Sequence, residues 1–340
     1  MSGKSFPKYF SAAFCLAACV AYLAGVFTPV ERIWHDQAFE RRGRALKTGD
    51  PRLLLIAVDD ETVHQYGFPL PRAVHARALD KLREHGVKTA IFDVLFFEKR
   101  EGDAELAAAT KRHGRVVHLF TAEPEVEGNP NGSMTKVSLP VPVLAAAAQI
   151  LGSPVVTRHL DTDGHIRMFS LFNAEVEDPV RGKGQPTASL AAAALSSFLG
   201  KKLDDLNAEF GGAKPPVLVL NYRRPIAWLR HEKEDEAWLT MPLELREKSA
   251  VKIIDSPYRP ISMMDLLSGR LTAAQRKSLK GALAMIGSTT IGYYDHYPTP
   301  FTSHAPGAEY HLNVMDNIFN GDALRATSVF PVLLLVLIAA

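Results

Sequence analysis

Aspartates stand at or just after the ends of apolar segments in this sequence, where carboxylates can hold a metal ion or exchange protons. Ligands of open α/β sheets bind beyond the carboxyl ends of the strands, and clustered carboxylates bind Mg²⁺ or Ca²⁺ or share a proton. The aspartates concerned are Asp59, Asp60, Asp93 and Asp295. They define one hypothesis, a membrane-anchored metal-dependent hydrolase. Alternatively, they cap turns and helices or pair with Arg72 and Arg167.

Asp295 lies in GSTTIGYYDHYPTPF, residues 287–301, directly after the apolar run 282–286. Glycines in such a loop let backbone N–H groups approach an anion, but a single glycine turn is weak evidence for a phosphate site. The chain has no G-x-S-x-G, H-E-x-x-H or G-x-x-x-x-G-K-[ST] motif. Asp161-Thr-Asp-Gly164 begins like a calcium loop, but no glutamate closes it. We therefore predict no catalytic residue and no cofactor, and we leave a metal site open.

The elements that must position these residues alternate between strand and helix. Apolar runs at 52–58, 87–96 and 115–120 predict buried strands, and the segments 71–85 and 103–113 between them have helical periodicity. Right-handed crossovers place such strands in a parallel sheet. The sequence predicts an α/β fold with a mainly parallel central sheet flanked by helices. Later segments are expected to extend it: strands at 165–172, 217–220 and 282–286, and helices at 187–199, 261–267, 272–279 and 308–319.

The run from Tyr9 to Phe27 has no charged residue and is about as long as a membrane-spanning helix. Lys4 and Lys8 precede it, which favours a cytoplasmic N-terminus. An uncleaved signal anchor is the interpretation that we favour; the alternatives are a cleaved signal peptide and lipoprotein processing at Cys19. The second uncharged run, 329–340, predicts the start of another membrane helix at which the chain is truncated, or else a buried terminal helix.

These runs divide the chain into a cytoplasmic tail (1–8), a transmembrane helix (9–27), an extracytoplasmic domain (28–328) and the start of a second transmembrane helix (329–340). The formal charge of +2 gives no electrostatic case for nucleic-acid binding. Both cysteines, Cys15 and Cys19, lie in the first apolar run, so no disulfide framework and no thiol chemistry is expected in the domain.

Several segments in order resemble one family, the type-two CHASE domain, a sensory extracellular domain of bacterial transmembrane receptors associated with cyclases and histidine kinases. The resemblance covers nearly everything between the two apolar runs. The sequence departs from the family pattern at Arg223 and Arg224, where a glycine is more typical. The matching segments are residues 57–97, 161–172, 220–225, 262–269, 285–301 and 306–324.

The resemblance implies a sensor in the periplasm or outside the cell, attached to a bacterial inner (cell) membrane. It implies an unknown small-molecule or envelope signal, a homodimer, and a cytoplasmic output module beyond this chain: a class III adenylate or guanylate cyclase, a histidine kinase or a Ser/Thr kinase. This chain itself is then not an enzyme. A purely structural envelope protein is a third hypothesis. The matched polar residues form either a pocket or the scaffold: Asp59, Asp60, Arg72, Asp93, Arg167, Asn221, Asp295, His311 and Asn313.

Overall fold

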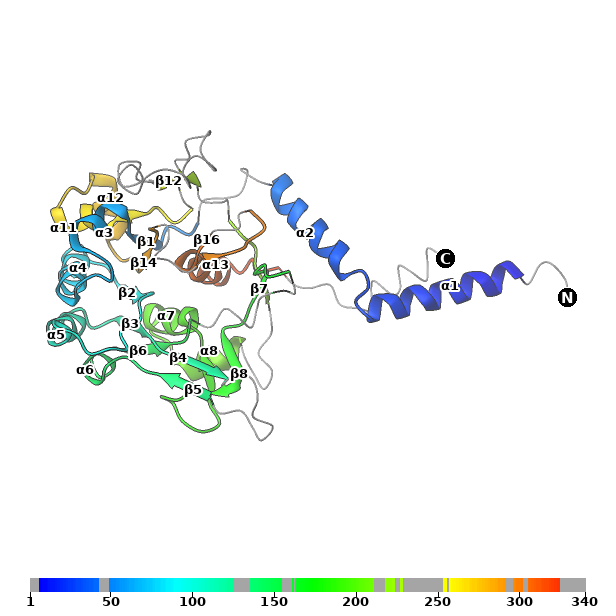
Figure 1. The fold of residues 1–340 in the computed structure, drawn as a ribbon, viewed down its shortest axis with the longest axis horizontal. Coiled ribbons are helices and arrows are strands. Elements are labelled where there is room, and N and C mark those ends of the chain that lie inside the picture. The colour runs from blue at the N-terminus through cyan, green and yellow to red at the C-terminus, as the bar shows by residue number, and fades with distance from the viewer. Residues whose placement is uncertain are drawn as a thin grey trace.

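The computed structural model shows an α/β body from which two N-terminal helices project (Figure 1). It describes residues 6–42, 49–124, 135–154, 161, 163–210, 218–223, 227–228, 253–255, 257–290, 296–301 and 305–324. Asp295 and the run 329–340 lie outside the described residues.

A six-stranded sheet in the order β13-β1-β14-β2-β3-β6 forms the centre of the body, and every neighbouring pair is parallel. The predicted α/β fold with a mainly parallel sheet is confirmed. β1 is buried along its whole length, as its unbroken run of leucine, isoleucine and valine requires. The strands are β1 (Leu53–Val58), β2 (Thr89–Phe92), β3 (Val116–Leu119), β6 (Ile150–Gly152), β13 (Ile261–Ser262) and β14 (Leu283–Ser288).

Helices cover both faces of this sheet (Figure 1). Because successive side chains of a strand point to opposite faces, Leu54 and Ile56 of β1 enter one core while Leu53 and Leu55 enter the other. The first core is closed by α4 (Arg72–Glu84), α5 (Asp103–His113), α6 (Pro142–Ala145), α11 (Met263–Ser268) and α12 (Ala273–Leu279). The second core is closed by α7 (Leu190–Leu199), α8 (Leu203–Phe210) and α13 (Gly307–Asn320).

The sequence prediction differs from the structure in the later segments. The expected strand at 165–172 does not join the central sheet: β7 (Met168–Phe169) pairs with β10 (Leu218–Val219) as a separate antiparallel sheet. Its alternation of polar and apolar residues suits a surface ribbon better than a strand buried on both faces. The remaining elements are the short helix α3 (Asp60–Tyr66) and the strand pairs β4 (Thr121–Pro124) with β5 (Thr135–Ser138), β8 (Phe172–Glu177) with β9 (Pro186–Ala188), β11 (Ala227–Trp228) with β12 (Ile253–Asp255), and β15 (His296–Tyr297) with β16 (Ala305–Pro306).

Two helices precede the body: α1 (Phe6–Leu23) and α2 (Thr28–Arg42). α1 ends four residues before the expected limit of the apolar run, because Gly25 adopts a φ of 73° in the turn that follows. Within the described part of the chain, no single helix is long and apolar enough to cross a membrane. The two helical segments Leu16–Leu23 and Thr28–Phe39, which are bent by 71° relative to each other, are together long and apolar enough by length and composition. The division into tail, transmembrane helix and extracytoplasmic domain stays a prediction.

Candidate functional site

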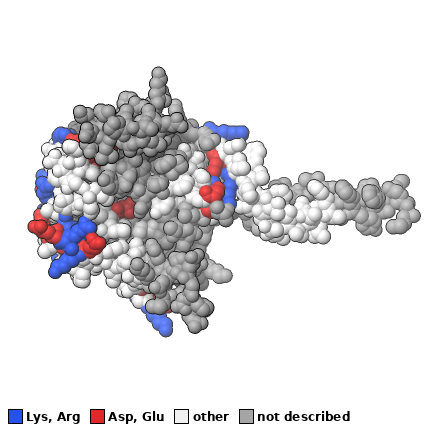
Figure 2. All heavy atoms as spheres, viewed as in Figure 1, with Lys and Arg blue, Asp and Glu red and all other residues white. Residues whose placement is uncertain are grey.

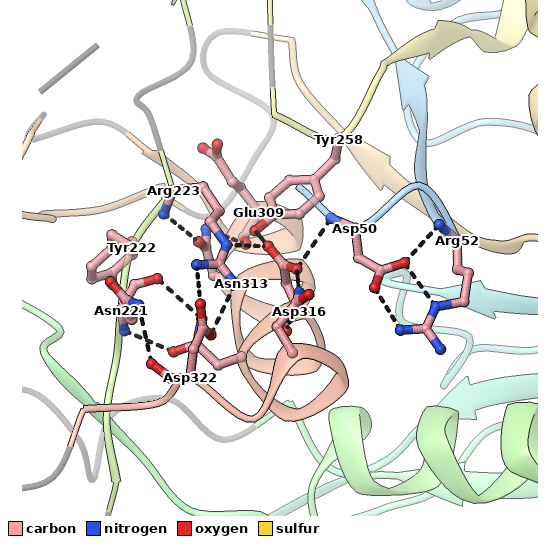
Figure 3. A network of polar contacts seen from close by, with 12 residues as sticks. Asp50, Arg52, Asn221, Tyr222, Arg223, Tyr258, Glu309, Asn313, Asp316 and Asp322 are labelled. Atoms are coloured by element: carbon pink, nitrogen blue, oxygen red, sulfur yellow. Dashed lines mark hydrogen bonds and ion pairs between the residues drawn. The ribbon is translucent and has the colours of Figure 1, made fainter. Parts of the chain in front are cut away.

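A three-residue segment after β10, Asn221-Tyr222-Arg223, contacts both α2 and α13. Figure 3 shows its contacts with α13 and with Asp322. The segment binds both helices through side-chain and backbone groups. We call the set formed by Arg42, Asn221, Arg223, Asn313, Asp316, Asn317 and Asp322 the junction cluster. Two of its members, Asn221 and Asn313, were candidate residues in the sequence.

Arg223 is the cation at the centre of the junction cluster. Its Nε donates to Oδ2 of Asp316, and its two Nη atoms donate to the carboxylate of Asp322 at 2.7 and 2.9 Å. Its backbone N–H donates to Oδ1 of Asn313 at 3.1 Å. Burial opposes the charged form of Arg223, but the hydrogen bonds to Asp322 and Asp316 outweigh it, so the pKa of Arg223 is raised above its usual value. Arg223 therefore stays charged and binds both Asp316 on α13 and Asp322 just after the helix.

Asp316 carries the contact further into the body. Its side chain is fully buried and accepts a hydrogen bond from the backbone N–H of Asp50, just before β1, at 3.1 Å. The hydroxyl of Tyr258 donates to it at 3.3 Å. Such a buried carboxylate is tolerated because a cation and several donors surround it. The helix α13 is thereby fixed to the start of the central sheet.

Asn221 joins α2 to the end of α13. Its Oδ1 accepts a hydrogen bond from Nη2 of Arg42, the last residue of α2, at 2.6 Å. Its Nδ2 donates to the carbonyl oxygen of Asp322 at 3.0 Å. Its backbone N–H and C=O are both bound by the side-chain amide of Asn317, at 2.7 and 3.0 Å. The side chain of Asn221 therefore contacts both α2, before the body, and Asp322, just after α13.

A second contact holds α2 nearer its middle. Arg167 donates from Nε and Nη2 to the two carboxylate oxygens of Asp36, and it also binds Asp161 at 2.6 Å and Asp163 at 3.0 Å. Burial opposes the charge on Arg167, but its hydrogen bonds to Asp36, Asp163 and Asp161 raise its pKa. The hydrogen bond from Arg167 lowers the pKa of Asp163 to about 2.

The apolar part of the same contact is Phe39, which is buried in the core on the α13 side of the sheet. Its ring meets those of Tyr222 and Phe301 edge to face, at centroid distances of 6.2 and 5.8 Å. Arg42 stacks over it, 4.6 Å from the ring centroid. The middle and the end of α2 are therefore packed on the body by charge and by apolar burial.

Other candidate residues have contacts within the scaffold. Asp59 caps α3, because its carboxylate accepts from the backbone N–H and the hydroxyl of Thr62 at 3.1 and 2.6 Å. Arg72 donates to Asp103 on α5 at 2.9 Å and stacks on Phe96, which ties α4 to α5. These two residues lie on the face of the sheet opposite to α13.

Asp60 is the first residue of α3, and Asp93 follows β2. The backbone N–H of Asp93 donates to the carbonyl oxygen of Ile286 at 2.8 Å, and its carboxylate lies beside Gly287. Within the described ranges, no group of three or more His, Cys, Asp or Glu side chains could hold a metal ion. The hydrolase hypothesis, which also needs Asp295, gains no support from the described residues.

His311 and Glu309 lie in the first turns of α13 and are both buried. Desolvation lowers the pKa of His311 to about 3 and raises the pKa of Glu309 well above its usual range. His311 is then neutral near pH 7. Figure 3 shows the Glu309 carboxylate directed away from the hydrogen bonds of the junction cluster.

Sequence reasoning missed most partners in these contacts: Asp36, Arg42, Asp316, Asn317 and Asp322. One signal was present. Asn313, Asp316, Asn317 and Asn320 recur at helical spacing within a helix whose other face is apolar, so a polar stripe enters the protein. A buried polar stripe requires partners of its own.

Neither the curated proteins nor the solved structures include a match to this chain. The family model described as the CHASE2 domain matches residues 13–340, nearly the whole chain. This match agrees with the segments that carried the resemblance. The chain belongs to the CHASE2 domain family, the sensory extracellular domains of signalling receptors.

Proposed function

We propose that this chain is the extracytoplasmic input domain of a bacterial membrane receptor, anchored by the apolar segment 9–27, and that it controls a cytoplasmic output module. The carrying observation is the junction cluster, in which Asn221 contacts both α2 and the segment after α13. In a receptor of this kind, these are the two connections between the sensor and its membrane segments. A change in the body that moves Asn221 must therefore act on both.

The physical mechanism is a shift between two arrangements of the body. A signal that binds one arrangement better than the other changes their populations by its differential affinity. The junction cluster is suited to transmit that shift because the contacts of Arg223 with Asp316 and Asp322 are short and charged, and Arg223 and Asp316 are buried. A cyclase or a histidine or Ser/Thr kinase is the proposed output, and a homodimer is the proposed assembly, because cyclases and histidine kinases work as dimers.

Membrane topology tests the first part of the proposal. With Cys15 and Cys19 replaced by alanine, single cysteines are placed at Ser2 and at Lys183, an exposed body residue. A membrane-impermeant maleimide added to intact spheroplasts is expected to label Lys183→Cys and to reach Ser2→Cys only after lysis. Labelling of Ser2→Cys alone in intact spheroplasts would place the body in the cytosol and refute the proposal.

The coupling role is tested in the receptor that carries its output module. Asn221→Ala removes the side-chain contacts to Arg42 and Asp322. We expect basal output to change by about fivefold or more, which corresponds to a coupling free energy of about 1 kcal/mol. The matched control is Arg112→Ala, which removes an exposed pair with Asp80 far from the junction cluster. Equal output from both variants would contradict the coupling role.

A further inference from the structure

One face of α2 carries large apolar side chains that the body does not cover. Val30, Ile33 and Trp34 are 50%, 57% and 61% exposed, and Val26 and Phe27 in the preceding turn are 62% and 43% exposed. The spacing of three and four positions puts Val30, Ile33 and Trp34 on one side of α2. We call these five residues the α2 stripe.

The orientation of the α2 stripe is fixed, because the opposite side of α2 is bound to the body. Asp36 pairs with Arg167, Phe39 is buried, and Arg42 donates to Asn221. These residues are three apart and form their own face of the helix. Rotation of α2 to bury the stripe would break all of these contacts.

The α2 stripe continues the apolar surface of α1. Phe14, Leu16, Val20 and Leu23 of α1 are exposed by 56% or more. On the side of the molecule seen in Figure 2, the described atoms of α1 bear no acidic or basic side chains, whereas charged atoms gather where α2 reaches the body. α1 and α2 meet at an angle of 71°.

We propose that the α2 stripe lies in the interface between the membrane and water, against the phospholipids of the outer face. This inference rests on the proposed function for the insertion of α1. A spanning helix is tilted by about 20° on average, so a helix bent from it by 71° lies closer to the bilayer plane than to its normal. Amphipathic helices bind there through one apolar face, and tryptophan prefers this depth. The stripe then keeps the base of the body, with its ion pairs to α2, at the lipid surface.

A bilayer is the occupant that the structure favours over a second copy of the chain. The stripe is directly continuous with the segment that lipid surrounds. A helix lying near the bilayer plane presents one side to lipid and the other to the body, as the two faces of α2 require. In Figure 1, α1 extends beyond α2 and away from the body.

The experiment uses the full chain in phosphatidylcholine/phosphatidylglycerol vesicles. The chain has three tryptophans, and Trp228→Phe with Trp238→Phe leaves Trp34 alone. We expect lipids brominated near the headgroup to quench Trp34 at least about twofold more than lipids brominated near the chain end, and iodide to quench it weakly. In the variant that also carries Trp34→Phe, Lys183→Trp should be quenched by iodide and not by lipid.

Two further variants separate the possible failures. If Trp34 is quenched by iodide while Phe14→Trp is quenched by deeply brominated lipid, α1 is inserted and only the inference on the stripe is wrong. If iodide also quenches Phe14→Trp, the anchoring that the proposed function requires is wrong. Spin labels at Ile33→Cys, in the background without Cys15 and Cys19, detect contact between two copies of the chain. A single short distance between the labels, together with protection of Trp34 from both lipid and iodide, would overturn the membrane assignment in favour of a dimer contact.

Discussion

Asp36 and Arg167, 131 positions apart in the sequence, are joined by two hydrogen bonds that use both oxygens of one carboxylate. Asp36 belongs to α2, and Arg167 precedes β7 of the body. Paired geometry of this kind is more specific than a single contact, because both partners are held in one plane. The pair therefore fixes the rotation of α2 about its own axis as well as its distance from the body.

Arg167→Met is expected to loosen α2, because three carboxylates then face each other without their shared cation. Removal of one partner from a buried pair costs about 3–5 kcal/mol. Because Asp36 and Asp163 are partly exposed, we expect the free energy of unfolding to fall by about 2–3 kcal/mol, measured on the full chain in detergent. Hydrogen exchange should quicken in α2 by about tenfold or more. Asp163→Asn, at the more exposed end of the cluster, is the control and should change stability by less than about 1 kcal/mol. Unchanged exchange in α2 would show that Phe39 and Arg42 hold the helix without the ion pair.

Buried histidines predict a loss of stability in acid. Desolvation lowers the pKa of His75, His118 and His311 to about 3 each, from an ordinary value of 6.5. The unfolded chain then binds more protons than the folded chain between pH 6.5 and about 3, so stability falls as the pH falls through that range. Each histidine contributes a slope of about 1.4 kcal/mol per pH unit.

The test is unfolding of the full chain between pH 7.5 and 4.5. His75→Phe should flatten the slope, because phenylalanine suits the ring contacts of His75 with Phe92 and Phe96, both at 5.5 Å, and does not titrate. A slope that is identical in the wild-type chain and in His75→Phe would show that His75 is accessible to protons in the folded state.

Glu309 predicts the opposite dependence on pH. Burial raises its pKa well above the ordinary 4.5, so its contribution to stability is fully present below pH 4.5 and is lost as the pH rises through the folded-state pKa. Glu309→Gln keeps the shape and removes the titration. Because burial raises the folded-state pKa, we expect the variant to be more stable than the wild type at pH 8 and equally stable at pH 4. Loss of stability at pH 8 would indicate that the carboxylate has a cationic partner.

Gly287 is the penultimate residue of β14, and a larger residue does not fit there. A Cβ atom at this position would lie 2.6 Å from Cβ of Ala308 on α13. Gly287→Ala must therefore push α13 away from β14, at a cost of about 1–3 kcal/mol. The neighbouring Ser288→Ala is the control: the buried Ser288 hydroxyl has no hydrogen-bond partner among the residues that the structure describes, so its removal should be neutral or stabilising. Thermal unfolding of both variants in detergent distinguishes the two effects, and a neutral Gly287→Ala would contradict the tight approach.

The sequence was a good guide where one local pattern decided the outcome. The helix 103–113 is found with the predicted bounds, because its periodicity agrees with a terminal Gly114 in the left-handed conformation. The two-residue strand β13 was predicted as the start of a helix. It forms a strand because it pairs with β1, which lies far from it in the sequence, and no local pattern shows that pairing. The candidate site was likewise predicted only where a local pattern was present. Asn221 and Arg167 were found through the resemblance, but their partners on α2, Arg42 and Asp36, were not, because nothing local specifies a pair that closes across more than a hundred residues.

The position of β14 in the sheet has a consequence for biosynthesis. Leu283 of β14 pairs with Leu53 of β1 on one side and with Thr89 of β2 on the other, so the latest of these strands separates the two earliest. The strands β2, β3 and β6 can pair with one another as soon as they are made, but β1 cannot join them, because the position between β1 and β2 is filled only by a segment made much later. Sheets that depend on such distant pairings form slowly. The facing edges of β1 and β2 therefore stay open until most of the polypeptide has been made, and we expect them to be prone to mispairing during that interval.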